Sequence, residues 1–583
     1  WAVTNHPRDL KRFFDFSRYA FGSPKEMVKL PLDYAKGLFH AIHGGALGKA
    51  DALFDQYERS GAAFSIIQRN LTTREMLRDV AGMPPKPQPL WVQVVRSPET
   101  LLRLMLKSAR TFNAVVEDTP KLMSMIRGLR RGEPLEQVAY ETANFGGSPN
   151  FGRSGSLGQE LNLFWMFYNA RLQGTTGDLR RLREAPASTM AKIAVGTVAP
   201  GIALYLWNAQ FRGNHGIDEV PEPDRQRYWI HLLGDTYQAA DGSIHRKYLK
   251  LAKEETDMVV WPLIEGALDW LKANDPPSLA KLATDFAGNV SPITFNVKGE
   301  PTGINTLWAV GAGALSSANP AIRLPVEVPF NYSAWKQGAI VSRGLAEHTL
   351  PPEQLRPTTS PTAIRLGRVL NMPPILLEYA ITSATGGLGQ SVLDALDRLQ
   401  GKSLPETVGE WERMARLPGF SRVMGAGGSG QARDLEERLY QTWDEARKTK
   451  GSLKIAGERQ ATTGRADAIT QDPAMLTKVA VEDTLREIAT HLSHIRQAQV
   501  FVTHHLEAPV KDKQEALRSL DEAKLELLAA FKALETSTNK FTELPGIPDA
   551  PPSGRPARVP APARPSFRRT PPEAIEEEAP EAE

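Results

Sequence analysis

The sequence predicts a mainly α-helical protein, an array of helices joined by short Pro- and Gly-rich connectors that ends in a long helical hairpin and a disordered tail. Apolar residues recur mostly at spacings of three and four residues, which is typical of helices with one buried face. Strict alternation of apolar and polar residues is scarce, so short strands are expected only near residues 294–297. The 46 Gly and 44 Pro residues divide the pattern into short segments.

Composition excludes several classes of protein. The 583 residues carry 70 basic and 67 acidic side chains, and the resulting net charge of +3 lacks the basic excess of most nucleic-acid-binding proteins. There is no Cys, which excludes disulfides, thiolate zinc sites and cysteine nucleophiles. The chain begins with Trp1 and shows no signal peptide, so we expect it to continue a larger protein on its N-terminal side.

Changes in composition divide the chain into four predicted regions. Residues 1–115 form an N-terminal helical region, and residues 116–425 form a larger helical domain. Residues 426–541 contain the C-terminal helical hairpin. From residue 542 to 583 the chain is dominated by Pro, Ala, Arg and Glu, a composition that cannot bury a core and is expected to be disordered.

The most apolar stretch runs from Ile193 to Trp207 and contains no charge. It is shorter than the roughly 20 residues of a spanning helix, and Pro200-Gly201 is expected to interrupt it. The favoured interpretation is a buried helical hairpin in a soluble core. The alternative is an element that enters a bilayer after a conformational change. A second apolar tract, residues 303–315, is rich in small residues and is expected to pack in the core.

The strongest helical patterns lie near the C-terminus. An amphipathic helix is expected over residues 431–448, with Leu435, Leu439 and Trp443 on one face. Over residues 473–539 two apolar stripes are separated by Pro509, which predicts two long antiparallel helices. The stripes consist of Val479, Leu485, Ile488, Leu492 and Ile495, and of Leu517, Leu520, Leu525, Leu528 and Phe531.

For each group of candidate site residues, a structural role is favoured over a catalytic, cofactor-binding or metal-binding role. Residues 425–430 match a dinucleotide-binding glycine pattern, but no parallel-sheet pattern surrounds them, so a flexible linker is favoured. His491, His494, His504 and His505 cluster without a carboxylate at partner spacing, which favours a solvated helix face over a metal site. The isolated carboxylates Glu265, Glu327 and Glu378 are assigned to helix surfaces or salt bridges.

A basic and aromatic segment near the N-terminus offers a further alternative. Its residues could form an interfacial helix or a phosphate-contacting patch, but core aromatics beside surface charges are favoured. They are Arg8, Lys11, Arg12, Phe13, Phe14, Phe16, Arg18 and Tyr19. The sequence therefore predicts no catalytic, cofactor-binding or metal-binding residue, and no cofactor.

Several short segments in a fixed order resemble a known family. They are residues 150–156 (NFGRSGS), 163–174 (LFWMFYNARLQG), 248–251 (YLKL), 261–265 (WPLIE), 319–327 (NPAIRLPVE), 350–360 (LPPEQLRPTTS), 373–379 (PPILLEY) and 385–389 (TGGLG). This succession resembles the large polyvalent protein-associated domain that is thirty-eighth in its series, over roughly residues 50–450. The family occurs near the C-terminal ends of very long phage and prophage proteins.

The proline and glycine positions in these segments suggest structural roles. Thr359 or Ser360 is expected to cap a helix that runs to Leu370. A second helix is expected to start at Pro373 or Pro374 and to end before the glycine pair at 386–387.

The resemblance implies a structural, non-catalytic part of a large phage protein. Some family members are similar to internal virion proteins, which are ejected with the genome through the host envelope. The expected partners are copies of the chain and other virion or ejection proteins, with host-membrane contact through residues 193–207, DNA nearby and no small-molecule substrate. The expected location is the virion and then the host cell envelope. The alternative is an accessory module of a polyvalent protein, co-injected with phage or plasmid DNA into the host cytoplasm, whose enzymatic domains precede this chain.

Overall fold

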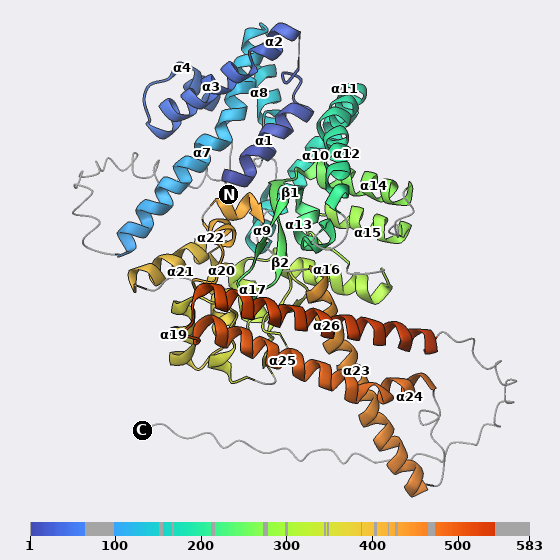
Figure 1. Cartoon of the computed structure of the whole chain (residues 1–583). Helices are drawn as coiled ribbons and strands as arrows, with labels where there is room; N and C mark the ends of the chain where they lie inside the picture. Colours follow the sequence, from blue (N-terminus) through green and yellow to red (C-terminus); the bar gives the residue numbers. More distant parts are fainter. Residues whose placement is uncertain are drawn as a thin grey trace, which may run out of the picture.

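Figure 1 shows the computed structural model of the chain, in which three groups of helices follow one another from the N-terminus to the C-terminus. The structure describes residues 2–21, 23–63, 98–150, 155–165, 168–211, 216–271, 278–297, 301–342, 345–346, 349–385, 388–401, 405–417, 419–425, 430–463 and 473–542. Within these ranges the fold is mainly α-helical, as predicted. The predicted disordered tail, most of the glycine pattern at 425–430 and the glycine pair at 386–387 lie outside the described residues.

The N-terminal helices enclose a core around α7. They are α1 (Ala2–Phe16), α2 (Pro24–Val28), α3 (Leu30–His40), η1 (Ala41–Ala46), α4 (Ala52–Arg59), α7 (Pro98–Arg130) and α8 (Leu135–Phe145). Phe13, Tyr19, Tyr57 and Leu122 are buried among them, which confirms that aromatics of the N-terminal segment are core residues. The charges of that segment are not all on the surface, however, because the Arg12 side chain is buried as well.

The apolar run from Ile193 to Trp207 is not a hairpin, and the favoured prediction was wrong. It belongs to one continuous helical path composed of α11 (Pro186–Ile193), the π-helical turn η3 (Ala194–Val198), α12 (Ala199–Asn208) and η4 (Ala209–Phe211). Pro200 lies in the first turn of α12, directly after the π-helical turn η3, and the helical path continues through it. The preceding helices are α9 (Gly155–Phe164) and α10 (Tyr168–Glu184).

A β-hairpin stands at the centre of the fold, where only helices were expected. Strand β1 (Tyr228–Gln238) pairs antiparallel with β2 (Ile244–Ala252), from Tyr228 opposite Ala252 to Gln238 opposite Ile244. The short strand β5 (Met424–Gly425) extends the sheet along β2. The expected strands at 294–297 do not form, and that segment is a loop. A two-residue pair, β3 (Tyr332–Ser333) with β4 (Gly338–Ala339), lies elsewhere.

Short helices precede and follow the β1–β2 hairpin in the chain. They are η5 (Ile217–Glu219), α13 (Glu222–Arg227), α14 (Glu255–Leu271), α15 (Leu279–Val290), α16 (Gly303–Ser317), α17 (Pro320–Glu327), η6 (Pro351–Glu353), α19 (Pro361–Leu370), α20 (Pro374–Ala384), α21 (Leu388–Leu399), α22 (Glu410–Arg416) and η7 (Phe420–Arg422). The Ser360 hydroxyl accepts a hydrogen bond from the Ala363 amide, which confirms the predicted cap of α19. Helix α20 begins at Pro374, as expected.

Helix α16 contains the second apolar tract, and it packs in the core on one side only. Ala309, Ala312 and Gly313 are buried. Ile304 and Leu307 are largely exposed, so the prediction of core packing is right for one face of this helix and wrong for the other.

The C-terminal helices confirm the strongest prediction from the sequence. Helix α23 (Gly430–Thr463) buries Leu439 and Trp443, and α24 (Pro473–Ala480) packs against it. Helices α25 (Glu482–His504) and α26 (Val510–Thr542) lie side by side, joined at the predicted connector (Figure 1). Most residues of the two stripes are buried, although Leu525 is 46% exposed.

The β-hairpin also joins the C-terminal helices to the rest of the chain. Its turn contains Gly242, whose φ of +93° favours glycine, and a Cβ there would lie 2.0 Å from the Leu517 carbonyl oxygen of α26. The Gln238 side-chain amide donates to the Gln514 carbonyl oxygen at 2.7 Å, and that of Gln499 donates to the Asp241 carbonyl oxygen at 2.6 Å.

Candidate functional site

Helix α1 presents a charged face to the middle of the molecule, and that face is buried. The Arg12 guanidinium lies 2.7 Å from an Asp178 carboxylate oxygen of α10 and 3.2 Å from a Glu254 oxygen. It also donates to the Gly174 carbonyl oxygen at 3.3 Å. Each of these partners is far from Arg12 in sequence, 242 positions away in the case of Glu254. The Arg12 contacts therefore fix α1 against two distant elements.

Lys11 makes a second set of contacts one residue earlier. Its ammonium group lies 2.8 Å from a carboxylate oxygen of Asp257 in α14, donates to the Thr197 hydroxyl at 2.9 Å, and pairs with Asp15. Asp257 also accepts hydrogen bonds from the Thr197 hydroxyl at 2.8 Å and the Trp229 indole at 3.1 Å. Lys11 and Asp257 thus connect α1 to η3 and to the β-hairpin.

The carboxylates of this network have perturbed acidities. Burial raises the pKa of Asp178 to about 7, although Arg12 acts in the opposite direction. Burial, together with the negative charges of Asp178 and Glu255, raises the pKa of Glu254. Burial would also raise the pKa of Glu255, but Arg8 and Arg12 outweigh it and hold that pKa below its usual range. The charges of this network therefore depend on one another.

The helical path from α11 to α12 has an unusual distribution of side chains. Its buried positions include Thr189, Thr197 and Asn208, which are polar. The Asn208 amide donates to the Ile230 carbonyl oxygen at 2.7 Å and accepts from the Leu232 amide at 3.1 Å. Between these positions Gly201 allows close packing, because a Cβ there would lie 2.3 Å from the Trp261 ring. The inner face is therefore held by hydrogen bonds and small residues.

The outer face of the same path is apolar. Met190 is 56% exposed, Val195 68% and Leu206 53%, and Ala194, Ala199 and Ala203 are exposed between them. A surface helix of a soluble protein shows the opposite arrangement, with its apolar stripe buried and its polar stripe in water. Among the described residues, Pro186–Phe211 is the one helix long and apolar enough to cross a membrane by length and composition.

The three predicted structural carboxylates lie in different places and do not form a site together. Glu327 is fully buried, where it accepts from the Ala334 amide and the Tyr379 hydroxyl, both at 2.8 Å, and pairs with Arg323 at 3.1 Å. Glu265 and Glu378 are half-buried, and burial raises the pKa of each. The salt-bridge assignment holds for Glu327, although this residue is not on the surface.

The predicted histidine cluster lies at the C-terminal hairpin. His491 and His494 are exposed on α25, which confirms a solvated face for this pair. His504 is half-buried, with its ring 3.4 Å from the Arg356 carbonyl oxygen. Within the described ranges no three His, Asp or Glu side chains are grouped so that they could hold a metal ion.

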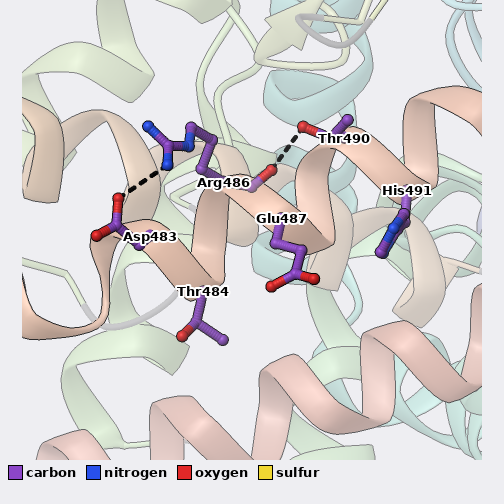
Figure 2. Close-up of a pocket in the computed structure, with 6 residues that line it drawn as sticks. All are labelled: Asp483, Thr484, Arg486, Glu487, Thr490 and His491. Carbon is purple, nitrogen blue, oxygen red and sulfur yellow. Dashed lines mark hydrogen bonds and ion pairs between the residues drawn. The ribbon is translucent and has the colours of Figure 1, made fainter.

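A shallow hollow runs along the exposed side of α25 (Figure 2). Its lining residues all come from this helix and are Asp483, Thr484, Arg486, Glu487, Thr490 and His491. Arg486 pairs with Asp483 at 3.0 Å, and the Thr490 hydroxyl donates to the Arg486 carbonyl oxygen at 2.8 Å. Since no second element contributes to it, the hollow brings no groups together for catalysis or chelation.

Sequence reasoning missed the network around Arg12 and Lys11. Apart from Asp15, which follows Lys11 by four residues in α1, its acidic members come from other elements and follow no local motif. The exposed apolar face was also missed, because the run contains no charged residue and its polar Thr197 lies on the buried side.

Replacement of Lys11 by Met should destabilise the fold strongly. Asp15 and Asp257 would then be buried without their ammonium partner, and breaking a buried pair removes about 3–5 kcal/mol. Denaturant unfolding measures the change. Lys36→Met, at an exposed position of α3, is the matched control and should stay within about 0.5 kcal/mol of wild type. Equal effects of the two variants would show that the Lys11 contacts contribute nothing.

The carboxylates predicted to be structural should not support turnover. If the intact protein has an enzymatic activity, Glu265→Gln and Glu378→Gln should retain it. Glu327→Gln should retain it wherever folding is retained, with a lowered melting temperature because Arg323 loses a buried charged partner. Circular dichroism and activity are measured on the same samples. A variant with an unchanged spectrum and lost turnover would contradict the assignment.

Comparison with known proteins places one family on this fold. No curated protein and no solved structure matches the chain. A family described as Large polyvalent protein associated domain 38 matches residues 217–415, which begin at η5, contain the β1–β2 hairpin and end in α22. This range is narrower than the resemblance over residues 50–450, and it leaves out the segments at 150–156 and 163–174 and the whole Pro186–Phe211 helix. Residues 217–415 of the chain are therefore similar to the Large polyvalent protein associated domain 38 family.

Proposed function

We propose that this chain is a non-catalytic, structural region of a large phage protein, an internal virion protein that takes part in genome ejection and meets the host membrane through the Pro186–Phe211 helix. The observation that carries the proposal is the exposed apolar face of that helix. The family match supports the coarser part, a region associated with large polyvalent proteins. Since the helix lies outside the matched residues, membrane contact is proposed for this chain and not for the family.

The dimensions of the helix suit a bilayer. Its 26 residues extend about 39 Å at 1.5 Å per residue, which exceeds the roughly 30 Å of a hydrocarbon core. The charged residues nearest the apolar run are Lys192 and Arg212. Long basic side chains near the ends of such a segment can reach the headgroup region.

The inner face determines how far the helix can enter lipid. Thr197 and Asn208 are satisfied by Asp257, Lys11 and the β1 backbone, and hydrocarbon offers them no such partners. The outer face can contact a bilayer surface with these bonds intact. Full insertion requires the polar residues to leave their partners, so we expect it only when the packing against α1 and α14 is loosened.

A second candidate function shares the family match. The chain could be an accessory module of a polyvalent protein that enters the host cytoplasm with phage or plasmid DNA and carries its enzymes elsewhere. The family match fits both candidates. The exposed apolar helix favours the first, because a co-injected cytoplasmic module has no evident use for it.

The membrane contact is tested by flotation with liposomes. The protein should float with anionic vesicles, and more so at a urea concentration that loosens its packing. Ala199→Lys should abolish flotation, because a Lys at the centre of an inserted helix costs about 2.5–3.5 kcal/mol. Ala199 is exposed in the soluble fold, so this variant should keep its melting temperature.

Ser188→Lys is the matched control for flotation. It places the same charge on an exposed position of the same helix, but in its first turn, from which the side chain can reach water. This variant should float as wild type does. Membrane contact is ruled out if wild type never floats under any loosening condition, or if Ala199→Lys floats equally well.

The virion assignment is tested on purified particles. Mass spectrometry of particles from a phage or prophage that encodes the chain should detect its peptides at a constant ratio to the capsid protein. Peptides found only in infected or induced cells, and not in particles purified to constant density, would favour the accessory-module candidate.

A further inference from the structure

Helix α14 turns an apolar face outward, as the Pro186–Phe211 helix does. Its exposed residues are Leu263, Ala267, Trp270 and Leu271, which recur at helical spacing along one face. Trp270 is 70% exposed and Leu271 is 72% exposed. The acidic residues of the helix are buried or half-buried. Helix α14 therefore shows to solvent the kind of face that a surface helix of a soluble protein buries.

Helix α15 has the same arrangement. Its exposed residues are all apolar, and they are Leu279, Ala280, Ala283, Phe286 and Ala287. Its charged side chains, Lys281 and Asp285, are half-buried and pair with each other at 2.8 Å. Lys281 also donates to the Val297 carbonyl oxygen at 2.6 Å. The charges of α15 are thus used inside the fold, and its outer face is left without any.

Helix α14 lies between the α11–α12 path and α15. Its first turn is bonded to η3 through Asp257, and its last turn is bonded to α12, because the Tyr205 hydroxyl donates to Asp269 at 2.5 Å. Leu206 and Trp270 directly follow these two bonded residues, so the apolar faces of α12 and α14 adjoin there. Helix α15 packs against α14, and Figure 1 shows the three helices next to one another.

The absence of exposed charge separates these helices from the ordinary surface helices of the fold. Throughout the α11–α12 path, α14 and α15, every residue of which the structure describes, no exposed residue is charged. Helix α25, in contrast, exposes Asp483, Arg486 and Glu487. A protein partner meets an apolar patch that is surrounded by a polar rim, whereas hydrocarbon favours a surface without charge. The charge distribution therefore favours a bilayer over a second copy of the chain as the occupant of this surface.

We propose that the lipid-contacting surface of the chain extends from the Pro186–Phe211 helix over α14 and α15, with Trp270 and Leu271 entering the interfacial layer of the bilayer. This extension rests on the proposed membrane contact of that helix, and it adds two helices that bind lipid without leaving their places in the fold. Tryptophan suits the interfacial layer, because its ring is apolar and its indole N–H can bond to headgroups or water. Both side chains are already exposed, so the contact needs no loosening of the packing.

Site-specific fluorescence tests the extended surface. The chain contains no Cys, so a single Cys introduced into the full chain carries an environment-sensitive dye at one chosen position. Leu271→Cys labels α14, Leu206→Cys labels α12, and Gln497→Cys labels the exposed face of α25 as the control. With vesicles of phosphatidylcholine and phosphatidylglycerol, and without urea, the dyes at positions 271 and 206 should shift to shorter wavelength. Lipids that carry a quencher in their acyl chains should quench both dyes, and the dye at position 497 should stay unchanged.

The two labelled helices separate failure of the extension from failure of the membrane contact itself. A lipid-dependent shift at position 206 with none at position 271 would overturn the extension and leave the proposed membrane contact standing. No shift at either position, with or without urea, would overturn both.

Trp270→Ser should weaken the binding of the same vesicles at least about tenfold, since a large apolar side chain no longer leaves water on binding. Its melting temperature should equal that of wild type, because the ring is largely exposed in the fold. Phe501→Ser is the matched control, since this ring is 55% exposed on α25 and lies outside the proposed surface. The control should bind as wild type does. Equal binding by Trp270→Ser and wild type would overturn the proposal.

A second copy of the chain is the competing occupant. If it covered α14, the dye at position 271 would shift as the protein concentration rises without lipid. Sedimentation equilibrium would then show a dimer that Trp270→Ser dissociates, and this result would overturn the proposal. A monomer over the same concentration range, with a shift at position 271 only when vesicles are added, supports the bilayer as the occupant.

Discussion

The burial of charge on the inner face of α1 is the constraint on which the arrangement of the other elements depends. Lys11 and Arg12 are largely buried, where an unpaired ion would be strongly destabilising. Asp257 must therefore lie next to Lys11, and Asp178 and Glu254 next to Arg12. These carboxylates come from two segments, α10 with Asp178 and the start of α14, where Glu254 precedes the helix and Asp257 lies in its first turn. Their positions fix the paths of both segments, and with them the β-hairpin between, since Trp229 of β1 donates to the same Asp257.

The β-hairpin connects the charged network around α1 to the C-terminal helices. At one end of the hairpin Tyr228 pairs with Ala252, next to the charged network, and at the other its turn packs against α26. The backbone contacts of Gln238 and Gln499 allow little sliding between the turn and the C-terminal helices. The three groups of helices in Figure 1 are therefore held in register by a short sheet, although the fold is otherwise helical.

The elements of the fold that could be predicted are those whose residue pattern lies within one stretch of the sequence. Helices α25 and α26 were predictable, because Leu485, Ile488 and Leu492 repeat along a single helix face. The β1–β2 hairpin did carry a local signal, the Asp241-Gly242 turn pair between two segments rich in strand-forming residues. An irregularity in the pairing between Leu232 and Thr236 interrupts the alternation that would have strengthened it.

The candidate sites were less predictable because their partners are distant in the sequence. Nothing near Arg12 indicates a pairing with Glu254, 242 positions away. The pairing of Asp224 with Lys250 could not be inferred either, because the two residues lie 26 positions apart, in α13 and β2. Only the structure assigns Asp224 to Lys250.

The geometry of Thr197 links the charged network to the apolar helix. The Thr197 hydroxyl accepts a hydrogen bond from Lys11 and donates one to Asp257. The buried side of η3 is therefore bonded to the same two ions that fix the position of α1. Removing the helix from its place would leave Lys11 and Asp257 without one of their neutral partners. Removing α1 would in turn take Lys11 away from both Asp257 and Thr197. The two steps are therefore coupled in free energy, and any condition that weakens the docking of α1 must weaken the retention of the apolar helix as well. Proposed membrane entry is thereby tied to the position of the N-terminal helix, even though no residue of α1 belongs to the apolar face.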